Sequence, residues 1–362
     1  MTSRSHVALP VLGALLIVAA IAVPGAQPVA LPVALIAQAP AVGPSAGWTA
    51  PKTPWGEPDI EGRWPVMHMM GTPLQRAEAQ GTKASYTDEE MAARLKQAAG
   101  RGNRYQEAID AGNFGAALQA GVTDPGTPQR QTSLIMDPPN GRLPELTAEG
   151  TRQGTLMKSS WTAFQGEEIA WDAPEDFDTW DRCITRGMPA SMFPFRYNGG
   201  MEIFQSPGYV VLSLEMIHED RIIPTDGRAV LSGAFKTWMG EARGHWEGNT
   251  LVVETTNFNG RTASVNFGIQ GAPAGNRIPT SPQMKIVERF TRVSDDTMTY
   301  EITTTDPVVY TQPWTARFPL KLTPDYQWWE YACHEGNRTI RDFITSSRAE
   351  RAAQAAPSRT RP

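Results

Sequence analysis

The sequence lacks clusters of positive charge. Its 33 lysines and arginines are outnumbered slightly by 38 aspartates and glutamates, which gives a formal net charge of −5. There is no basic patch and no run of lysines, and proteins that bind nucleic acid rely on such patches to neutralise phosphates. We therefore expect no nucleic-acid partner.

Familiar catalytic motifs are also missing. The chain contains no G-x-S-x-G elbow, no phosphate-binding loop and no dinucleotide-binding fingerprint. Its 5 histidines form neither an H-E-x-x-H nor an H-x-H pattern, so no short segment supplies a metal site by itself. Any divalent metal would have to be bound by residues that are far apart in the sequence.

Cysteine is scarce, since only Cys183 and Cys333 occur. Closed zinc sites usually need four ligands in short paired spacings, which two distant cysteines do not provide. In an oxidising compartment the pair is a candidate disulfide, and two buried free thiols are the alternative. We predict the disulfide, which would close a loop of about 150 residues and stabilise the fold by on the order of 4 to 5 kcal/mol.

A long apolar run occurs at the start of the chain. Arg4 and His6 precede VALPVLGALLIVAAIAVPGA, which has the positive start and apolar middle of a secretory signal. The alternative is a retained membrane anchor, but several prolines interrupt the run of about 20 apolar residues that a span needs. We expect residues 1–39 to be a signal peptide cut after Ala39, with an earlier cut near Ala26 as the alternative. The mature protein is then secreted or periplasmic, and it contacts a membrane only through an uncleaved leader.

The rest of the chain is predicted to have a β core flanked by other segments. Residues 40–58 are rich in proline, alanine, glycine and serine and are expected to be an extended linker. The further predicted parts are a helical and loop-rich N-terminal part packed on the core (59–200), an antiparallel β core (201–337), an amphipathic helix (338–356) and a disordered tail (357–362).

The N-terminal part combines helix signals with one long loop. Capping residues at Thr87 and Thr147 predict two helix starts. Residues 161–196 are irregular and aromatic, and a loop of this length is usually functional. We expect its aromatic side chains to cap the core, namely Trp171, Phe177, Trp180, Phe193 and Phe195. Arg186, in this loop, and Tyr197, which follows it, are candidates for ligand binding.

Alternating apolar residues separated by turn residues recur through the second half of the chain. The predicted strands are 201–205, 209–217, 221–224, 244–246, 250–258, 284–293, 297–307, 315–322 and 326–334. Successive hairpins of this kind predict a mainly β protein, an antiparallel meander that closes into a barrel-like sheet with N-terminal helices and a C-terminal helix.

Six of the nine predicted strands carry one glutamate. Glu254 and Glu288 share a strand face with apolar residues, and Glu301 shares one with threonines. A buried carboxylate is costly unless it is paired. The available cross-strand partners are Lys285, Arg289, Arg292, Arg317 and Lys321. For any single glutamate an ion-paired sheet face is therefore the expected role.

Two predicted strands end in the same pair, His218-Glu219 and His334-Glu335. Period-two alternation also places Glu330 on the strand face of His334. Histidines beside carboxylates can share a proton or bind a divalent metal. A metal would use His218, His334 and one of Glu215, Glu219, Glu330 or Glu335. The enzyme hypothesis assigns acid-base or metal-assisted chemistry, as in a lyase, isomerase or hydrolase, to His218, His334, Glu330, Glu335 and Arg221.

Several ordered blocks resemble a family of secreted, mostly uncharacterised bacterial proteins that occur in many copies in soil bacteria. The blocks are TPWGEPDIEGRW, RCITRGMP, GYVVLSLEMIHEDRIIPTDGR, RGHWEGNTLVVETTNF, ERFTRV, DPVVYTQPWTARFP and YACHEGN. The resemblance extends from about Pro54 to Asn337 and implies secretion and one shared fold.

The segments Gly62-Arg63-Trp64 and Gly244-His245-Trp246 are similar to the short first-strand motif of lipocalins. This similarity implies a ligand-holding barrel. The alternative to an enzyme is therefore a non-catalytic protein that binds an apolar or aromatic small molecule, with Arg186, Tyr197 and Trp328 as its contacts.

Overall fold

The computed structural model describes residues 47–99, 104–113, 115–116, 126–160, 170–266, 269–273 and 277–355. The chain divides into two compact units, Met1–Ala41 and Val42–Pro362, and every described residue belongs to the second. The predicted signal peptide and the predicted C-terminal tail lie outside the described residues. Within these residues, no helix combines the length and the apolar character that crossing a membrane requires.

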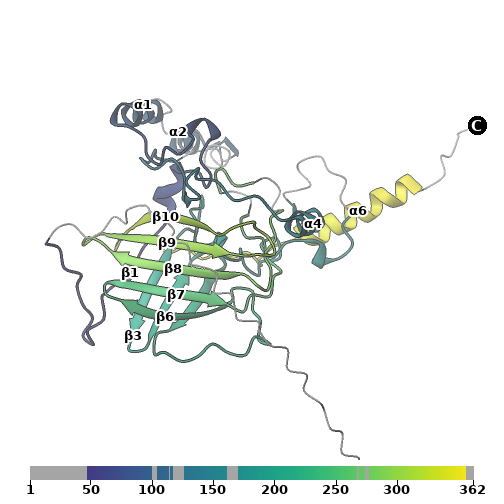
Figure 1. The fold of residues 1–362 in the computed structure, drawn as a ribbon. Coiled ribbons are helices and arrows are strands. Elements are labelled where there is room, and N and C mark those ends of the chain that lie inside the picture. Colours follow the sequence, from purple (N-terminus) through teal and green to yellow (C-terminus); the bar gives the residue numbers. More distant parts are fainter. Residues whose placement is uncertain are drawn as a thin grey trace, which may run out of the picture. The chain divides into compact units, whose positions relative to one another are not determined.

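The fold is mainly β and contains two antiparallel sheets (Figure 1). The smaller sheet has the order β1 (Gly62–Arg63), β3 (Met201–Ser206), β4 (Tyr209–Leu214), β5 (Glu219–Pro224). The larger sheet has the order β2 (Ile135–Asp137), β10 (Trp314–Lys321), β9 (Thr297–Thr305), β8 (Lys285–Arg292), β7 (Thr250–Thr256), β6 (Glu241–Glu247). From β3 to β5 and from β6 to β10 each strand pairs with the next one in sequence, which confirms the antiparallel meander, whereas β1 pairs with β3 and β2 with β10. The ladders of the described strands form two sheets and do not join into one ring.

The apolar faces of the two sheets meet in one core. Burial alternates residue by residue along β4, β8, β9 and β10, as expected for strands with one face turned inward. The shared cluster contains Ile203, Leu212 and Ile223 from the smaller sheet and Ile286, Phe290, Tyr300 and Phe318 from the larger one. Burial of these side chains is the main stabilising contribution to the fold.

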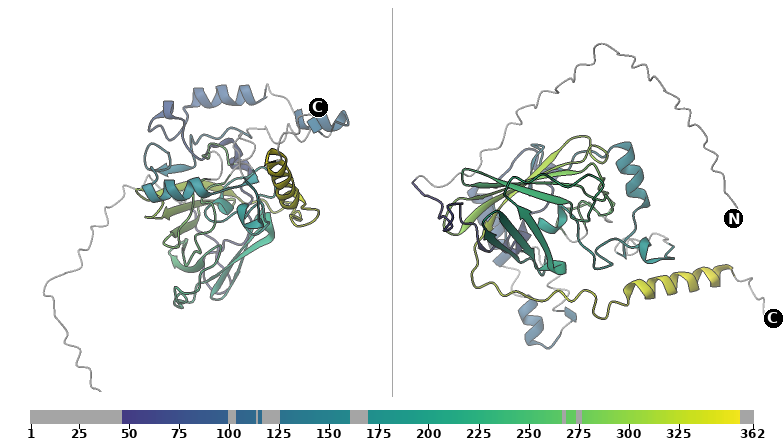
Figure 2. Two further views of the ribbon diagram at one scale, coloured as in Figure 1. Left: turned by 90° about the vertical axis from the view of Figure 1, so that its right-hand side faces the viewer. Right: turned by 90° about the horizontal axis from the view of Figure 1, so that it is seen from below.

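The helices α1 (Asp88–Ala99), α2 (Arg104–Asp110), α4 (Ala148–Leu156) and α6 (Thr339–Ala355) lie outside the two sheets (Figures 1 and 2). The predicted capping box before α1 is confirmed, because the Thr87 N–H donates to Glu90 at 2.7 Å and the Glu90 N–H donates to the Thr87 hydroxyl at 3.3 Å. The Thr147 hydroxyl accepts from the Gly150 N–H at 2.9 Å and caps α4 in the same way.

The aromatic side chains of the long loop are buried, as predicted. Their exposed fractions lie between 1 % for Phe193 and 6 % for Trp180. Trp171 and Phe177 stack with ring centroids 4.2 Å apart, and both contact Phe343 of α6 edge-on. The loop therefore attaches α6 to the rest of the unit through aromatic contacts.

The described part of the predicted linker is not extended. The Thr53 N–H donates to the Glu57 carbonyl at 2.9 Å, and the Asp59 N–H donates to the Pro51 carbonyl at 2.8 Å. Ala50 is buried as well. The prolines here set turn geometry instead of an extended chain, since proline also favours the corner positions of turns.

Two strand predictions are wrong in part or in whole. The strand predicted at 209–217 ends at Leu214, and the chain turns through Ile217 and His218, which have φ angles of 62° and 41°. The strand predicted at 326–334 is irregular and pairs with neither sheet. Its alternation of aromatic and polar residues instead reflects side chains that are partly buried against loops, a pattern that a short window cannot distinguish from a strand.

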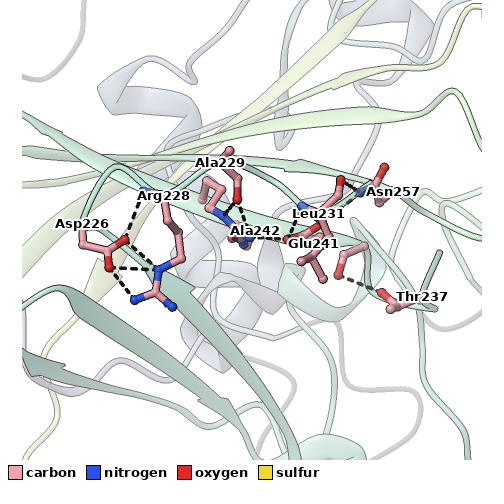
Figure 3. A network of polar contacts seen from close by, with 10 residues as sticks. Asp226, Arg228, Ala229, Leu231, Thr237, Glu241, Ala242 and Asn257 are labelled. Atoms are coloured by element: carbon pink, nitrogen blue, oxygen red, sulfur yellow. Dashed lines mark hydrogen bonds and ion pairs between the residues drawn. The ribbon is translucent and has the colours of Figure 1, made fainter. Parts of the chain in front are cut away.

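A polar network holds the connection between β5 and β6 in place (Figure 3). The Glu241 carboxylate accepts from the Leu231 N–H at 2.9 Å and from Asn257 Nδ2 at 2.9 Å. Arg243 donates to the Ala229 carbonyl at 3.0 Å. Because these bonds fix the backbone of the connection, the Leu231 side chain remains at the surface.

Candidate functional site

The histidines proposed for acid-base chemistry lie at the surface. His218 ends the short 3-10 helix Met216–His218, and His334 belongs to the irregular segment after Tyr326. Glu330 and Glu335 are exposed too. Because 326–334 is not a strand, the inferred strand face shared by Glu330 and His334 does not exist. Among the described residues, no three His, Cys, Asp or Glu side chains are arranged to bind a metal ion.

Arg221, proposed as a catalytic helper, is buried in the core. It forms a two-point ion pair with Glu288, one bond being Nη1 to Oε1 at 2.9 Å, and it also donates to the Thr255 hydroxyl. The Tyr300 hydroxyl donates to the same carboxylate at 2.8 Å. Burial alone lowers the pKa of Arg221, but the adjacent Glu288 carboxylate outweighs burial and raises it. This arginine links β5 to β8 across the core, and its charge is already compensated.

Glu215 is the centre of a second buried network and is 1 % exposed. Its carboxylate accepts from the Gly200 N–H at 2.9 Å, the Trp329 N–H at 2.7 Å and Asn198 Nδ2 at 3.1 Å. The Tyr326 hydroxyl donates to it as well. These donors come from segments more than a hundred residues apart, so this one carboxylate fixes the irregular segment 326–329 against the smaller sheet.

The predicted disulfide is confirmed. Cys183 and Cys333 are bonded, with Cα atoms 5.7 Å apart and 150 positions between them in sequence. The bond attaches the long loop to the segment that Glu215 also holds. Together the disulfide and the carboxylate restrain both ends of the segment 326–334.

An open cleft of about 400 Å³ lies over this restrained segment. We name it the aromatic cleft, and it is lined by Met67, Arg196, Tyr197, Asn198, Tyr326, Gln327 and Trp329. Tyr197 and Trp329 are 45 % and 64 % exposed. The Nη1 atom of Arg196 is buried and has no hydrogen-bond partner among the described residues. The cleft thus combines exposed aromatic rings with one cationic side chain, Arg196.

The structure brings two of the predicted ligand-binding residues together around Phe195. The Arg186 guanidinium lies 4.5 Å from the Phe195 ring centroid, and the Tyr197 ring lies 4.9 Å from it. Burial lowers the pKa of Arg186 to about 10 and raises the pKa of Tyr197 to about 12. Trp328 is not among the residues that line the cleft. It packs near Gly200, where an added Cβ would come within 3.2 Å of its ring.

Sequence reasoning missed Arg196, Asn198, Tyr326 and Trp329 as members of one site. The local signal was the run Arg196-Tyr197-Asn198-Gly199-Gly200. At Gly200 any side chain would collide with Glu215 and Tyr326, at 2.5 and 2.7 Å. A glycine pair directly after polar and aromatic residues indicates a close approach of backbone to another segment.

Comparisons with known proteins give no match, either to a family model, to a curated protein or to a solved structure.

Glu219, the first residue of β5, offers a test of the electrostatics of the smaller sheet. It accepts from the Thr185 hydroxyl at 2.7 Å, yet burial raises the pKa of its carboxyl above the usual value. Because the folded pKa exceeds the unfolded one, folding favours the protonated form, and the stability contributed by this group is lost as pH rises through the folded pKa. Glu219→Gln is therefore expected to raise the free energy of unfolding at pH 7 by on the order of 1 kcal/mol.

Urea unfolding at pH 7 and pH 4 measures this effect. The gain in the free energy of unfolding should shrink at pH 4. At that pH the Glu219 carboxyl of the unmodified protein is largely protonated in both the folded and the unfolded state. The change Asp325→Asn, at an exposed carboxylate that does not contribute to the pKa of Glu219, is the control and should alter stability little at either pH. An equal loss of stability in Glu219→Gln at both pH values would contradict this account.

Proposed function

We propose that the protein is a secreted, non-catalytic binding protein that holds a planar aromatic molecule with one acidic group in the aromatic cleft. The observation that carries this proposal is a cleft lined by Arg196 and by the exposed rings of Tyr197 and Trp329. Of the two hypotheses drawn from the sequence, this proposal adopts the binding protein, because that hypothesis accounts for the cleft. Acid-base chemistry by His218 and His334 remains a prediction, and neither residue lines the aromatic cleft.

The walls of the cleft favour a flat, unsaturated ligand. Its volume of about 400 Å³ falls in the range of about 300 to 1,000 Å³ that is usual for small-molecule sites. Tyr197 and Trp329 present ring surface to solvent, which is costly unless another surface covers it. Aromatic rings prefer offset-stacked or edge-to-face partners, and a planar ligand supplies such a partner.

The charge in the cleft favours an acid over a neutral ligand. Arg196 is the arginine that lines the cleft, and no carboxylate does so. A guanidinium binds a carboxylate through two parallel N–H donors, a geometry that a lysine does not reproduce. An acidic group in the cleft would pair with the Arg196 guanidinium.

The cleft is held in place before any ligand arrives. Glu215 fixes Tyr326 and the Trp329 backbone, and the disulfide restrains the segment after them. A site whose walls are already ordered loses less conformational entropy on binding. This arrangement supports a role in binding a small molecule more than a role in scaffolding.

We also propose a barrel-like closure of the two sheets. The edge strands β5 and β6 approach each other, since a Cβ added at Gly244 would come within 2.9 Å of Ile223. At the opposite edge the Thr323 N–H, just after β10, donates to the Arg63 carbonyl of β1 at 2.9 Å. Both approaches support the closure that the lipocalin-like motif implies. Secretion and membership of the soil-bacterial family likewise remain proposals, and the disulfide supports the former.

A thermal-shift panel tests the ligand class. Indole-3-carboxylate is expected to raise the melting temperature, because a ligand that binds the folded state stabilises it. Indole-3-carboxamide, which lacks the charge, and cyclohexanecarboxylate, which lacks the aromatic ring, should act at least about tenfold more weakly. If neither benzoate, cinnamate nor indole-3-carboxylate raises the melting temperature more than its neutral amide does, the proposed ligand class is wrong.

Two variants locate the effect. Arg196→Gln should abolish the preference for the acid over the amide, and Trp329→Ala should abolish the preference for the aromatic acid. Trp55→Ala is the matched control, since Trp55 is also exposed but does not line the cleft. An equal effect of the control and the cleft variants would remove the cleft as the binding site.

A further inference from the structure

Arg186 is a buried cation that forms no ion pair with any carboxylate of the described residues. The residue is 4 % exposed, and its Nε is buried without a hydrogen-bond partner. Among the described residues its guanidinium has one observed hydrogen bond, from Nη2 to Asn266 Oδ1 at 3.2 Å. Asn266 in turn donates to the Arg186 carbonyl at 3.2 Å, so the acceptor is locked in place. An arginine remains charged at neutral pH even when its pKa falls to about 10.

The other buried arginines of the described chain have a different environment. Arg221 has the Glu288 carboxylate. Arg76 donates to the Thr132 hydroxyl at 2.9 Å and to the Pro139 carbonyl at 2.6 Å. Arg292 donates to the carbonyls of Asp59 and Asp295. Each of these guanidinium groups has several acceptors or a carboxylate, whereas Arg186 has a single amide oxygen.

Aromatic contacts offset only part of the free-energy cost of burying the charge of Arg186. The Arg186 guanidinium lies 4.5 Å from the Phe195 centroid and 5.8 Å from the Trp180 centroid. Such cation–π contacts are weaker than a buried carboxylate or several hydrogen bonds. A buried charge generally requires both a counter-charge and satisfied donors. The described residues therefore leave the requirement of Arg186 unmet.

Arg186 lines a cavity with room for a small species. The volume is about 20 Å³, and roughly 10 to 15 Å³ is enough for one water-sized occupant. The Ser191 hydroxyl and the backbone of Gly199 and Gly200 also line the cavity, while Met192 and Met216 supply apolar walls. No carboxylate lines the cavity. Its lining therefore favours an anion over a cation.

We propose that this cavity binds one small monovalent anion against Arg186. The occupant is either a free ion such as chloride or a carboxylate that reaches in from the aromatic cleft, because Asn198 lines both spaces. The shared chemistry is a compact negative charge placed against the Arg186 guanidinium, with Ser191 in the cavity wall. The proposal goes beyond the binding function of the cleft and does not require it.

Thermal unfolding of the purified protein in halide-free buffer tests the site. Chloride replaces gluconate, an anion too large for the cavity, at constant ionic strength. The melting temperature is expected to rise by about 3 °C for each tenfold increase of chloride above its dissociation constant. Formate should act in the same way.

Arg186→Met is expected to abolish the anion response, and its similar volume should preserve the fold. Arg182→Met is the matched control. Arg182 also has an unpartnered Nε but does not line the cavity, so this variant should keep the response. If chloride and formate act no more strongly than gluconate, or if Arg186→Met responds as the unmodified protein does, the proposal is wrong.

Adding an aromatic acid to the same experiment distinguishes the two possible sources of the anion. A response to indole-3-carboxylate that is lost in both Arg186→Met and Trp329→Ala places the carboxylate of a cleft ligand in the cavity. A response to chloride that survives Trp329→Ala identifies a free ion. Both results support an anion site at Arg186. The second result supports it even if the aromatic cleft proves not to bind aromatic acids.

A crystallographic measurement covers the case in which Arg186→Met does not fold. Crystals of the unmodified protein grown with bromide should show an anomalous peak in contact with the Arg186 guanidinium. The absence of such a peak, in crystals where other bromide ions are located, would overturn the proposal.

Discussion

Replacing Glu288 with alanine is expected to lower the free energy of unfolding by about 3 to 5 kcal/mol. The change leaves Arg221 buried between the two sheets with no compensating charge, since both side chains are at most 3 % exposed. It also leaves the Tyr300 hydroxyl without the acceptor that it contacts at 2.8 Å. Urea unfolding followed by circular dichroism measures the loss.

The double variant Glu288→Leu and Arg221→Met provides the control for this prediction. It removes both charges while keeping apolar volume, and such replacements are often close to neutral in stability. We expect it to recover most of the stability lost in Glu288→Ala. A double variant as unstable as the single one would mean that shape and not charge determines the effect.

Removing the disulfide is expected to lower the free energy of unfolding by about 4 to 5 kcal/mol, the chain-entropy estimate for a loop of this length. The bonded cysteines are 150 positions apart, so the bond constrains nearly half of the unfolded chain. Urea unfolding of the variant with Cys183→Ser and Cys333→Ser measures the difference. Serine keeps the size of both side chains nearly unchanged.

Reductant supplies the matched control for the disulfide. Dithiothreitol should destabilise the unmodified protein to the level of the double serine variant, and it should leave that variant unchanged. Equal stability of the unmodified protein with and without reductant would contradict the prediction.

The hydrophobic alternation in the sequence predicted the sheets because it follows directly from strand geometry. Most predicted strands of the β core occur close to the expected residues, and the ion pairs Lys285–Glu254 and Arg317–Glu301 confirm the expected cross-strand pairing. The cysteine pair was predictable because the sequence offers only one intramolecular disulfide. These features depend on local patterns or on a single possible pairing.

The site depends on contacts that local patterns do not encode. Glu288 was recognised as a carboxylate that needs a partner, but its partner Arg221 lies on the other sheet, and period-two alternation relates residues within a sheet only. Glu215 was assigned to a strand, and its actual role depends on donors from Gly200 and Trp329. The sequence of 326–334 resembles that of a strand because aromatic and polar residues alternate in it. In the structure its aromatic residues pack on loops.

Calorimetric titration with indole-3-carboxylate tests the central claim most directly. The unmodified protein is expected to bind one molecule per chain, Trp329→Ala to bind at least about tenfold more weakly, and Trp55→Ala to bind as the unmodified protein does. Absence of binding by the unmodified protein, or equal affinity in Trp329→Ala, would contradict the assignment of the aromatic cleft as the ligand site.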